Sequence, residues 1–398
     1  MSGSLTRTKT MLYSAGSIGA GAFFAFNNFV LPQLLKSAGA GDLLTGLLSS
    51  TRSIEGALIQ PTIGALSDRT RSRLGRRRPF IALGIPLSAA FFLFAATQRD
   101  VVGLTVAIIL FSIFFNVAAD PYVALLADIT TLGERGILQG VSTAIQLASQ
   151  VAFLLLISTA SASGIPAWSY VLVAGLMVVT FAVTVAGVPE SAVVDRSEER
   201  LGVRRYIAEL LEHRQALRYL GAIFVFMVGF SAVLPYLTLF ITVDIGESEQ
   251  VALILAAGTL LVTGIAAVGF GRLADRIGTK PVLVTGWALL AVAAFGGILI
   301  RHLPETVAVV MLAGVGNGAA TAAGWPLLAS LVPPEKTGVF AGLKAAAESV
   351  AIPASVVVAA EVFLPRFSYR GVFVLLAGAI LIALFVLVRY VRPVSAGR

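Results

Sequence analysis

Long apolar runs recur along the whole chain, separated by short breaks that are charged or rich in Pro and Gly. Each run has about 20 residues or more, enough to cross about 30 Å of hydrocarbon as an α-helix. The runs cover residues 11–35, 43–66, 79–98, 101–126, 137–160, 167–188, 219–243, 250–271, 281–300, 305–331, 337–362 and 371–390. The pattern predicts an all-α polytopic membrane protein with twelve transmembrane helices. Because a polar stretch follows the sixth run, we expect two six-helix bundles, at 1–188 and 219–398, joined by a cytoplasmic linker at 189–218.

The linker region mixes charged residues with spaced apolar ones. Between Asp195 and Arg218, Leu, Val and Ile residues are interspersed among Glu and Arg residues. A stretch of this kind forms either an interfacial helix or a solvated linker, and the sequence leaves both interpretations open.

The composition also indicates a membrane environment. Hydrophobic residues make up 57% of the chain and charged residues 13%, against about 25% charged in a soluble domain. The chain has no Cys, which excludes disulfides and thiolate metal sites. His213 and His302 fall in predicted loops far apart in the sequence, so we expect no metal site and no bound cofactor. The run after the basic segment 1–10 is too long for a signal-peptide core and is expected to remain as the first helix.

The net charge of +8 is explained by topology rather than by a nucleic-acid partner. With both termini in the cytoplasm, the cytoplasmic segments hold 22 of the 29 Lys and Arg residues, and the opposite loops hold five. Lys and Arg are enriched in the cytoplasmic loops of membrane proteins. The distribution predicts cytoplasmic termini, and we expect a monomer in a bacterial inner membrane whose partners are the lipid bilayer and a small solute, with no nucleic acid.

The two halves repeat with an offset of 202 residues. Pro79 returns as Pro281, and Leu-Leu-Ala-Asp at 125–128 returns as Leu-Leu-Ala-Ser at 327–330. Duplication of a six-helix unit is common in secondary transporters, in which a solute site lies near the midplane between the halves. The chain is therefore predicted to move a small solute by alternating access.

One motif occurs in both halves. Residues 64–80 read GALSDRTRSRLGRRRPF, and residues 271–281 read GRLADRIGTKP. Both resemble a cytoplasmic loop of the major facilitator superfamily, which carries Gly-x-Leu-x-Asp-Arg and a basic cluster between helices two and three and is often echoed between helices eight and nine. The resemblance implies the major facilitator fold, with two pseudo-symmetric six-helix bundles.

The resemblance also implies a gating role for this motif. Asp68 or Asp275 is expected to meet helix N-termini and Arg side chains of a neighbouring helix while the cytoplasmic side is closed, and the Gly residues allow close helix approach. The basic cluster 76–78 serves either this gate or topology alone. We assign to the gating motif the residues Gly64, Asp68, Arg69, Gly75, Arg76, Asp128, Arg135, Gly271, Asp275 and Arg276.

The first copy of the motif is five residues longer than the second between its Asp and its Pro. This longer form resembles the glycoside-pentoside-hexuronide:cation symporters and, more strongly, the sucrose–proton symporters. Gln60-Pro61 ahead of the loop, Ala124 to Asp128, and the Glu-Arg-Gly turn at 134–136 agree with the latter group. The resemblance covers the first five predicted helices and implies cation-coupled transport of a sugar.

Two predicted helices carry charge pairs, although a central Asp, Lys or Arg in hydrocarbon costs roughly 2.5–3.5 kcal/mol. Arg52 and Glu55 are three residues apart, and Lys344 and Glu348 are four apart, so each pair shares one helix face. One interpretation is an intrahelical salt bridge that supports packing. The other is an ion pair that exchanges partners during transport, with protonation of the glutamate releasing its cation.

Asp120 is the strongest candidate for substrate or cation binding. It lies beside Pro121 in the fourth predicted helix, with no basic neighbour in that helix, and helix four of the superfamily lines the solute cavity. Amides suit hydroxyl-rich ligands, and aromatic faces stack on sugar rings. On this basis the candidate solute contacts, for each of which helix packing is the alternative role, are Asn27, Asn28, Asn116, Tyr236, Asn317 and Trp325.

The expected function is proton-coupled uptake of a sugar or glycoside. Sodium is the other coupling ion considered, but Arg52 beside Glu55 repels a cation and so favours protons. The alternative is a proton-driven exporter of amphipathic small molecules, since apolar residues dominate the helices. We do not expect an enzyme, because the sequence has no Asp-rich phosphate motif, nucleophile elbow or metal cluster.

Overall fold

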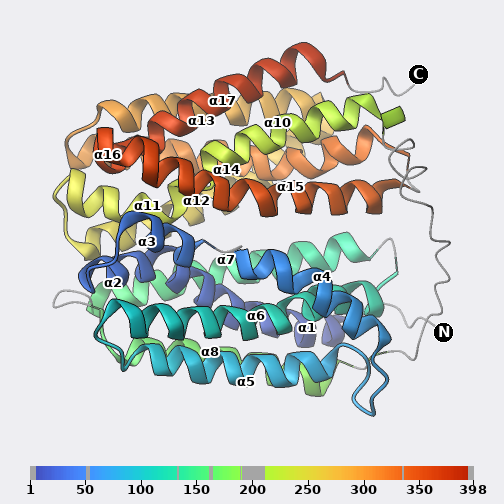
Figure 1. Cartoon of the computed structure of the whole chain (residues 1–398). Coiled ribbons are helices and arrows are strands. Elements are labelled where there is room, and N and C mark those ends of the chain that lie inside the picture. Colours follow the sequence, from blue (N-terminus) through green and yellow to red (C-terminus); the bar gives the residue numbers. More distant parts are fainter. Residues whose placement is uncertain are drawn as a thin grey trace. The chain divides into compact units, whose positions relative to one another are not determined.

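The computed structural model describes residues 6–50, 54–131, 134–160, 165–188, 190, 211–333 and 336–392, without the side chains of 54–58, 60, 61 and 65. All regular elements in these ranges are helical. The chain divides into two compact units: unit 1 is Met1–Asp195 with Glu249–Ala257, and unit 2 is Arg196–Ser248 with Gly258–Arg398. Figure 1 colours most of unit 1 blue to green and most of unit 2 yellow to red.

Unit 1 contains the helices of the first half. They are α1 (Arg7–Ala25), the π-helix η1 (Phe26–Val30), α2 (Leu31–Ser37), α3 (Asp42–Ser49), α4 (Ile54–Arg69), α5 (Arg78–Ala95), α6 (Val101–Ile129), α7 (Arg135–Ala160) and α8 (Trp168–Gly187). In Figure 1 α5 lies beside α6 and α8, and these pairs are in contact.

Unit 2 contains most of the second half. Its helices are α10 (Arg214–Phe230), α11 (Val233–Leu239), the π-helix η2 (Phe240–Asp244), α12 (Glu249–Ile277, from Gly258 on), α13 (Thr279–Leu299), α14 (Leu303–Ser330), α15 (Thr337–Val358), the π-helix η4 (Ala359–Phe363), α16 (Leu364–Phe367), the short 3-10 helix η5 (Ser368–Arg370) and α17 (Gly371–Tyr390). α13 contacts α14 and α17, and α10 contacts α15 and α17.

Ten helical segments of the described chain are long and apolar enough to cross a membrane. One of them, Thr337–Tyr390, runs through α15, α16 and α17 and has 54 residues, far more than the 20 or so that one crossing needs. Predicted helix 43–66 falls partly outside the described residues. The all-helical membrane fold is confirmed, and the number twelve and the side on which the termini lie stay predictions.

The second predicted helix is not continuous. α3 ends at Ser49, and Ser50 has extended backbone with φ −79° and ψ 133°. The Ser50 hydroxyl donates to the Leu47 carbonyl, while the Asn27 amide donates to the Ser49 carbonyl over 3.0 Å. Ser side chains compete for the backbone hydrogen bonds that a helix needs, which explains the break.

Helices α12 and α13 come closer in sequence than predicted. α12 continues six residues past the predicted end at 271, to Ile277, and only Gly278 separates it from α13. Gly278 has φ +93°, a conformation that glycine adopts without the penalty of a Cβ. The second copy of the gating motif is therefore helical up to this turn.

Small residues allow the helices of each unit to pack closely. A Cβ on Gly84 of α5 would lie 2.7 Å from the Phe114 carbonyl of α6, and one on Gly286 of α13 would lie 2.9 Å from the Gly316 carbonyl of α14. In lipid, helices associate through such close packing rather than through hydrophobic exclusion. The interfacial helix considered between Asp195 and Arg218 falls largely outside the described residues.

Candidate functional site

The first copy of the gating motif forms an ion-pair network within unit 1. Asp68 lies in the last turn of α4, and its carboxylate pairs with the Arg77 guanidinium just before α5. Arg77 also donates to the Ser67 hydroxyl, and its Nε lies 3.3 Å from Asp128 Oδ2. The side chain of Arg77 is 9% exposed, so these contacts satisfy a largely buried cation.

Asp128, in the last turn of α6, also binds Arg76. The Arg76 guanidinium reaches both carboxylate oxygens, Nη2 to Oδ1 at 2.5 Å and Nε to Oδ2 at 3.2 Å. This two-pronged geometry is the strong form of an arginine–carboxylate pair. Burial lowers the pKa of Arg76, but the hydrogen bond and charge of Asp128, with the other carboxylates of the network, outweigh burial and raise that pKa above its ordinary value.

Sequence reasoning missed Glu190, which follows α8 and completes this network. Its carboxylate accepts from the backbone N–H of Arg77 at 2.9 and 3.0 Å and lies 3.7 Å from the Arg76 guanidinium. Gly75 has φ +102°, and a Cβ there would lie 2.1 Å from Glu190 Oε2. The one available signal was an acidic residue directly after the sixth apolar run.

The second copy of the motif has different contacts. Asp275 and Arg276 are exposed on α12, and no ion pair or hydrogen bond of either side chain occurs within the described chain. Instead Lys280 Nζ, at the start of α13, donates to the carbonyls of Val391 at 2.6 Å and Val388 at 3.3 Å, where α17 ends. A lysine at a helix C-terminus offsets its partial negative charge.

The remaining gating residues lie near these ends. Arg69 is exposed at the end of α4, and Arg135 Nη2 donates to the Ala127 carbonyl of α6 at 3.2 Å. A Cβ on Gly64 or Gly271 would meet no atom within 4 Å in the described part of the chain, so neither glycine marks a close helix contact there.

Unit 2 contains a partly open cavity of about 210 Å³ that brings together two of the predicted solute contacts, Asn317 and Trp325, with Lys344 of the predicted ion pair. α10, α13, α14 and α15 all contribute to its wall. The other lining residues are Tyr219, Ile223, Phe226, Met227, Phe230, Leu283, Trp287, Ala320, Thr321 and Gly324. The cavity has the character of a small-molecule site, because aromatic walls carry a few polar groups.

The aromatic wall of the cavity is a stack of three rings. The Phe226 ring lies 4.8 Å from the Trp287 ring and 5.2 Å from the Phe230 ring, with interplanar angles of 14° and 16°. Trp287 is 2% exposed, so packing holds its indole in place. Sequence reasoning missed Trp287 and Phe226, since a lone aromatic in an apolar run gives no sign of which way it faces.

The polar wall of the cavity contains Lys344, the cation of the predicted Lys344–Glu348 pair. Lys344 Nζ donates to Glu348 Oε1 along α15, and the two side chains are 25% and 12% exposed. The Tyr219 hydroxyl donates to the Gly324 carbonyl over 2.8 Å, which fixes this ring at the cavity. The intrahelical salt bridge is therefore present, and its cation lines the cavity.

The candidates in unit 1 are not among the residues that line that cavity. Asn27 and Asn28 are buried in the π-helix η1, 5% and 7% exposed, and the Asn27 amide donates to Ser49. The Asn116 amide donates to the Ser112 carbonyl in its own helix at 2.9 Å. These bonds give Asn27 and Asn116 structural roles besides any contact with solute.

Asp120 is half-buried on α6 and makes an interaction within the chain. Two residues on, Tyr122 stacks on Tyr13 of α1, with ring centroids 4.6 Å apart. Each hydroxyl donates to the other residue's carbonyl, at 2.9 and 3.1 Å. This reciprocal pair ties α6 to α1 next to Asp120 and was not anticipated from the sequence.

Three further candidates complete the set. Arg52 and the side chain of Glu55 lie outside the described residues. Tyr236, on α11, is fully buried with its ring 6.0 Å from that of Tyr369. No cluster of His, Asp or Glu suited to a metal ion occurs in the described ranges.

Comparison with known proteins places these features in a family. The family described as MFS/sugar transport protein matches residues 12–362. Human proton-associated sugar transporter A is 46% identical over 68 residues, which are 16% of this chain and 9% of that protein. An uncharacterized MFS-type transporter of Mycobacterium tuberculosis is 28% identical over 103 residues, 26% of this chain and 22% of that one. The chain thus matches less than a quarter of the length of these relatives.

Solved structures share the fold. A structure of the nucleoside transporter NupG superposes with a TM-score of 0.76 at 12% identity, covering 96% of this chain and 99% of that one. A peptide transporter POT gives 0.73 at 13% identity, over 96% and 93%. At such identities the likeness shows the fold alone. The long family match shows that the chain belongs to the MFS/sugar transport protein family and is an integral membrane transporter of the major facilitator superfamily rather than an enzyme.

Proposed function

We propose that this protein imports a sugar or glycoside together with a proton, by alternating access, as a monomer in a bacterial inner membrane. The observation that carries the proposal is the cavity of unit 2, whose wall combines stacked aromatic rings with the Asn317 amide and with Lys344, the cation of an ion pair. The short match to proton-associated sugar transporter A and the distribution of Lys and Arg support it.

The cavity offers complementary contacts to a sugar ring. A pyranose has an apolar face that packs on an indole or phenyl ring, and hydroxyls around its rim. Asn317 both donates and accepts hydrogen bonds, and Thr321 adds a hydroxyl. At about 210 Å³ the cavity has room for part of a glycoside rather than a large drug.

The ion pair supplies a route to proton coupling. While Glu348 is ionised, it holds the Lys344 ammonium. When Glu348 takes up a proton, the attraction is lost and the Lys344 donors turn to the solute hydroxyls. Loss of the proton on the other side of the membrane restores the pair and expels the solute. Asp120 in unit 1 is the second carboxylate proposed to bind the cation or the solute.

The test is substrate-induced pH change outside liposomes that contain the purified protein, over a panel of sugars and glycosides. We expect external alkalinisation with at least one sugar, and loss of that signal in Glu348→Gln and in Asp120→Asn. Asp100→Asn is the matched control, because Asp100 caps α6 outside the apolar run and accepts from the Gly103 N–H at 2.8 Å. Asn caps helices equally well.

The outcomes separate the parts of the proposal. Sugar uptake without proton movement, unchanged in Glu348→Gln, would refute coupling through the ion pair but keep the solute class. No response to any sugar would refute the solute class.

The second candidate is proton-driven export of amphipathic compounds. Apolar and aromatic side chains make up most of the cavity wall, which suits an amphipathic compound. Proton movement in the same liposomes on addition of hydrophobic cations, with none for sugars, would support export. Trp287→Ala should weaken transport of either ligand class, whereas Asn317→Ala should affect only sugars, since it removes a hydrogen-bonding group from the wall.

A further inference from the structure

Unit 2 has a second hollow, on the opposite side of α14 from the aromatic cavity. It measures about 470 Å³ and is lined by Val262, Ile265, Ala266, Gly269, Phe270 and Leu273 of α12 and by Val315 of α14. Val315 and Asn317 are two residues apart, so they project from roughly opposite sides of α14. The hollow is therefore not an extension of the aromatic cavity.

The lining of this groove is entirely apolar. Ile265 is 66% exposed and Leu273 37% exposed, so the groove is open to its surroundings. Gly269 opens it further, since a Cβ there would meet no atom within 4 Å. In a membrane-spanning helix such a groove accommodates a hydrocarbon chain, and its volume lies within the range of about 300–1,000 Å³ typical of ligand sites.

Two arginines continue the same face of α12. Arg272 and Arg276 follow Ile265 by seven and eleven residues, spacings that return to one side of a helix. Both side chains are exposed, and neither makes an ion pair or hydrogen bond within the described chain. Asp275 is three residues from Arg272 and about 60° from it around the helix, but it forms no ion pair with either arginine within the described chain.

The first copy of the motif shows what these arginines lack. In unit 1, Arg76 and Arg77 are bound by Asp128, Asp68 and Glu190. Within the described chain the arginines of α12 form no such ion pair, and they follow directly on the apolar groove. Guanidinium groups bind phosphate through paired hydrogen bonds.

We propose that this groove binds one anionic phospholipid, with an acyl chain along Ile265 and Gly269 and its phosphate on Arg272 and Arg276. The inference does not depend on the sugar or the proton. It goes beyond transport, because it places a lipid on arginines of the second gating motif. The fraction of anionic lipid in the surrounding leaflet then determines whether the arginines of that motif are bound to phosphate.

The experiment is native mass spectrometry of the detergent-solubilised full chain, titrated with phosphatidylglycerol or with phosphatidylcholine of the same chains. One tightly held phosphatidylglycerol is expected. The Arg272→Gln/Arg276→Gln variant should lower its affinity about 25-fold, at about fivefold for each charge removed, and leave phosphatidylcholine unchanged. Gly269→Leu should weaken both lipids, since the new side chain fills the groove.

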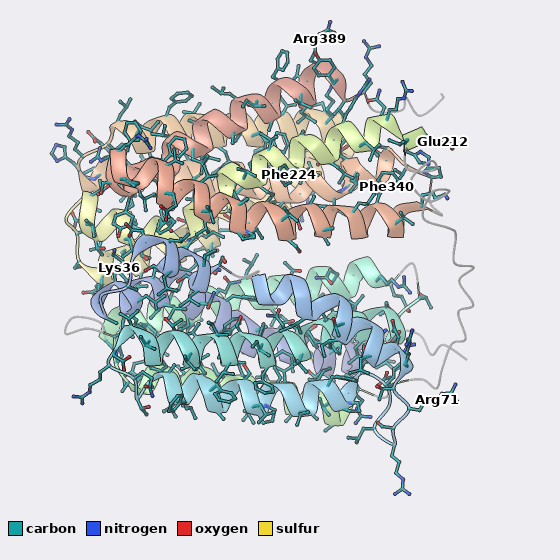
Figure 2. The ribbon with its side chains drawn as sticks, in the orientation of Figure 1. Lys36, Arg71, Glu212, Phe224, Phe340 and Arg389 are labelled. Atoms are coloured by element: carbon teal, nitrogen blue, oxygen red, sulfur yellow. The ribbon has the colours of Figure 1, made fainter. Side chains whose placement is uncertain are left out.

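Matched variants separate this site from general attraction of lipid to charge. Arg71→Gln/Arg73→Gln removes two exposed arginines of the first motif that border neither of the two cavities of unit 2. Figure 2 shows Arg71 on the loop that extends past α4 and α5. Gly175→Leu adds the same side chain at another open position. Both controls should keep the bound phosphatidylglycerol. Equal loss in control and test variants, or no loss in either test variant, would overturn the proposal.

Discussion

The two copies of the gating motif show how one sequence pattern acquires different partners. In unit 1, the loop between α4 and α5 is held by three carboxylates, and the two arginines that they bind, Arg76 and Arg77, are mostly buried. In unit 2, the equivalent turn is a single glycine, Asp275 is exposed, and lysine binds the end of α17. The five extra residues of the first copy supply the loop that the carboxylates hold.

The acid after α8 accounts for much of this difference. Glu190 follows α8, and the residue 202 positions later, Arg392, follows α17. The Glu190 carboxylate attracts the basic loop of the first copy. The corresponding Arg392 is a cation, and Lys280 of the second copy binds backbone carbonyls instead. Ion pairs therefore hold the first motif in unit 1. In unit 2, hydrogen bonds to the carbonyls at the C-terminus of α17 and the partial negative charge there hold Lys280.

The largest expected effect tests whether the network stabilises unit 1. Asp128→Ala leaves Arg76 and Arg77 without their shared acid, which should cost roughly 2–4 kcal/mol of stability because the guanidinium groups are mostly buried. Asp275→Ala in the second copy should give no measurable change. Thermal unfolding in detergent compares the two. Similar melting temperatures for both variants would show that the difference between the copies is not energetic.

The two turn glycines sharpen the comparison. Gly75→Ala must strain a positive φ and displace Glu190, whereas Gly278→Ala strains only the backbone, with its nearest neighbour 3.8 Å away. We expect a loss of about 2–3 kcal/mol for Gly75→Ala and about 1 kcal/mol less for Gly278→Ala. In a Glu190→Ala background the excess cost of Gly75→Ala should disappear. A double-mutant cycle measures this coupling, and strictly additive effects would contradict it.

Lys280 tests the second unit. Lys280→Met keeps the length of the side chain but removes the donors to Val388 and Val391, so about 1 kcal/mol should be lost. Hydrogen exchange should rise in the last turn of α17 and nowhere in unit 1. Unaltered exchange at the end of α17 would mean that other contacts hold that helix end.

The smallest expected effect depends on pH. The pKa of Arg76 is raised, so its contribution is fully present below its ordinary value and is lost only as pH rises through the raised value. Between pH 7 and pH 10 this contribution should not change. In Arg76→Lys the contribution is lost once pH rises above the ordinary lysine pKa of about 10.4, so its melting temperature should fall relative to the parent only above about pH 10.4. Parallel curves for the two proteins would argue against a charge-based contact.

Much of the fold was predictable because the signal is local. An apolar run of sufficient length becomes a helix wherever it lies in the membrane, and most of the predicted ends lie within a few residues of the observed ones. The break at Ser50 was not predictable from apolar character alone, since it coincides with hydrogen bonds from the Ser50 hydroxyl and from Asn27 of another helix. Hydropathy does not register such a contact.

The candidate site divides in the same way. The Lys344–Glu348 pair could be predicted because both residues lie on one helix, four apart. The cavity that they border could not, because Trp287, Asn317 and Lys344 come from three helices. The sequence of a single apolar run does not indicate which face of its helix packs against a neighbouring helix.

The sequence by itself determined the membrane class, the positions of most helices, the duplicated motif and the intrahelical ion pair, all of which depend on residues close together in the chain. Only the tertiary structure decided that Glu190 completes the first network, that Asp275 lacks such partners in the described chain, and that three stacked rings face Lys344. The physical reason is that helices in lipid associate by shape and by a few polar contacts. Which charges and rings meet is therefore set by packing between distant segments.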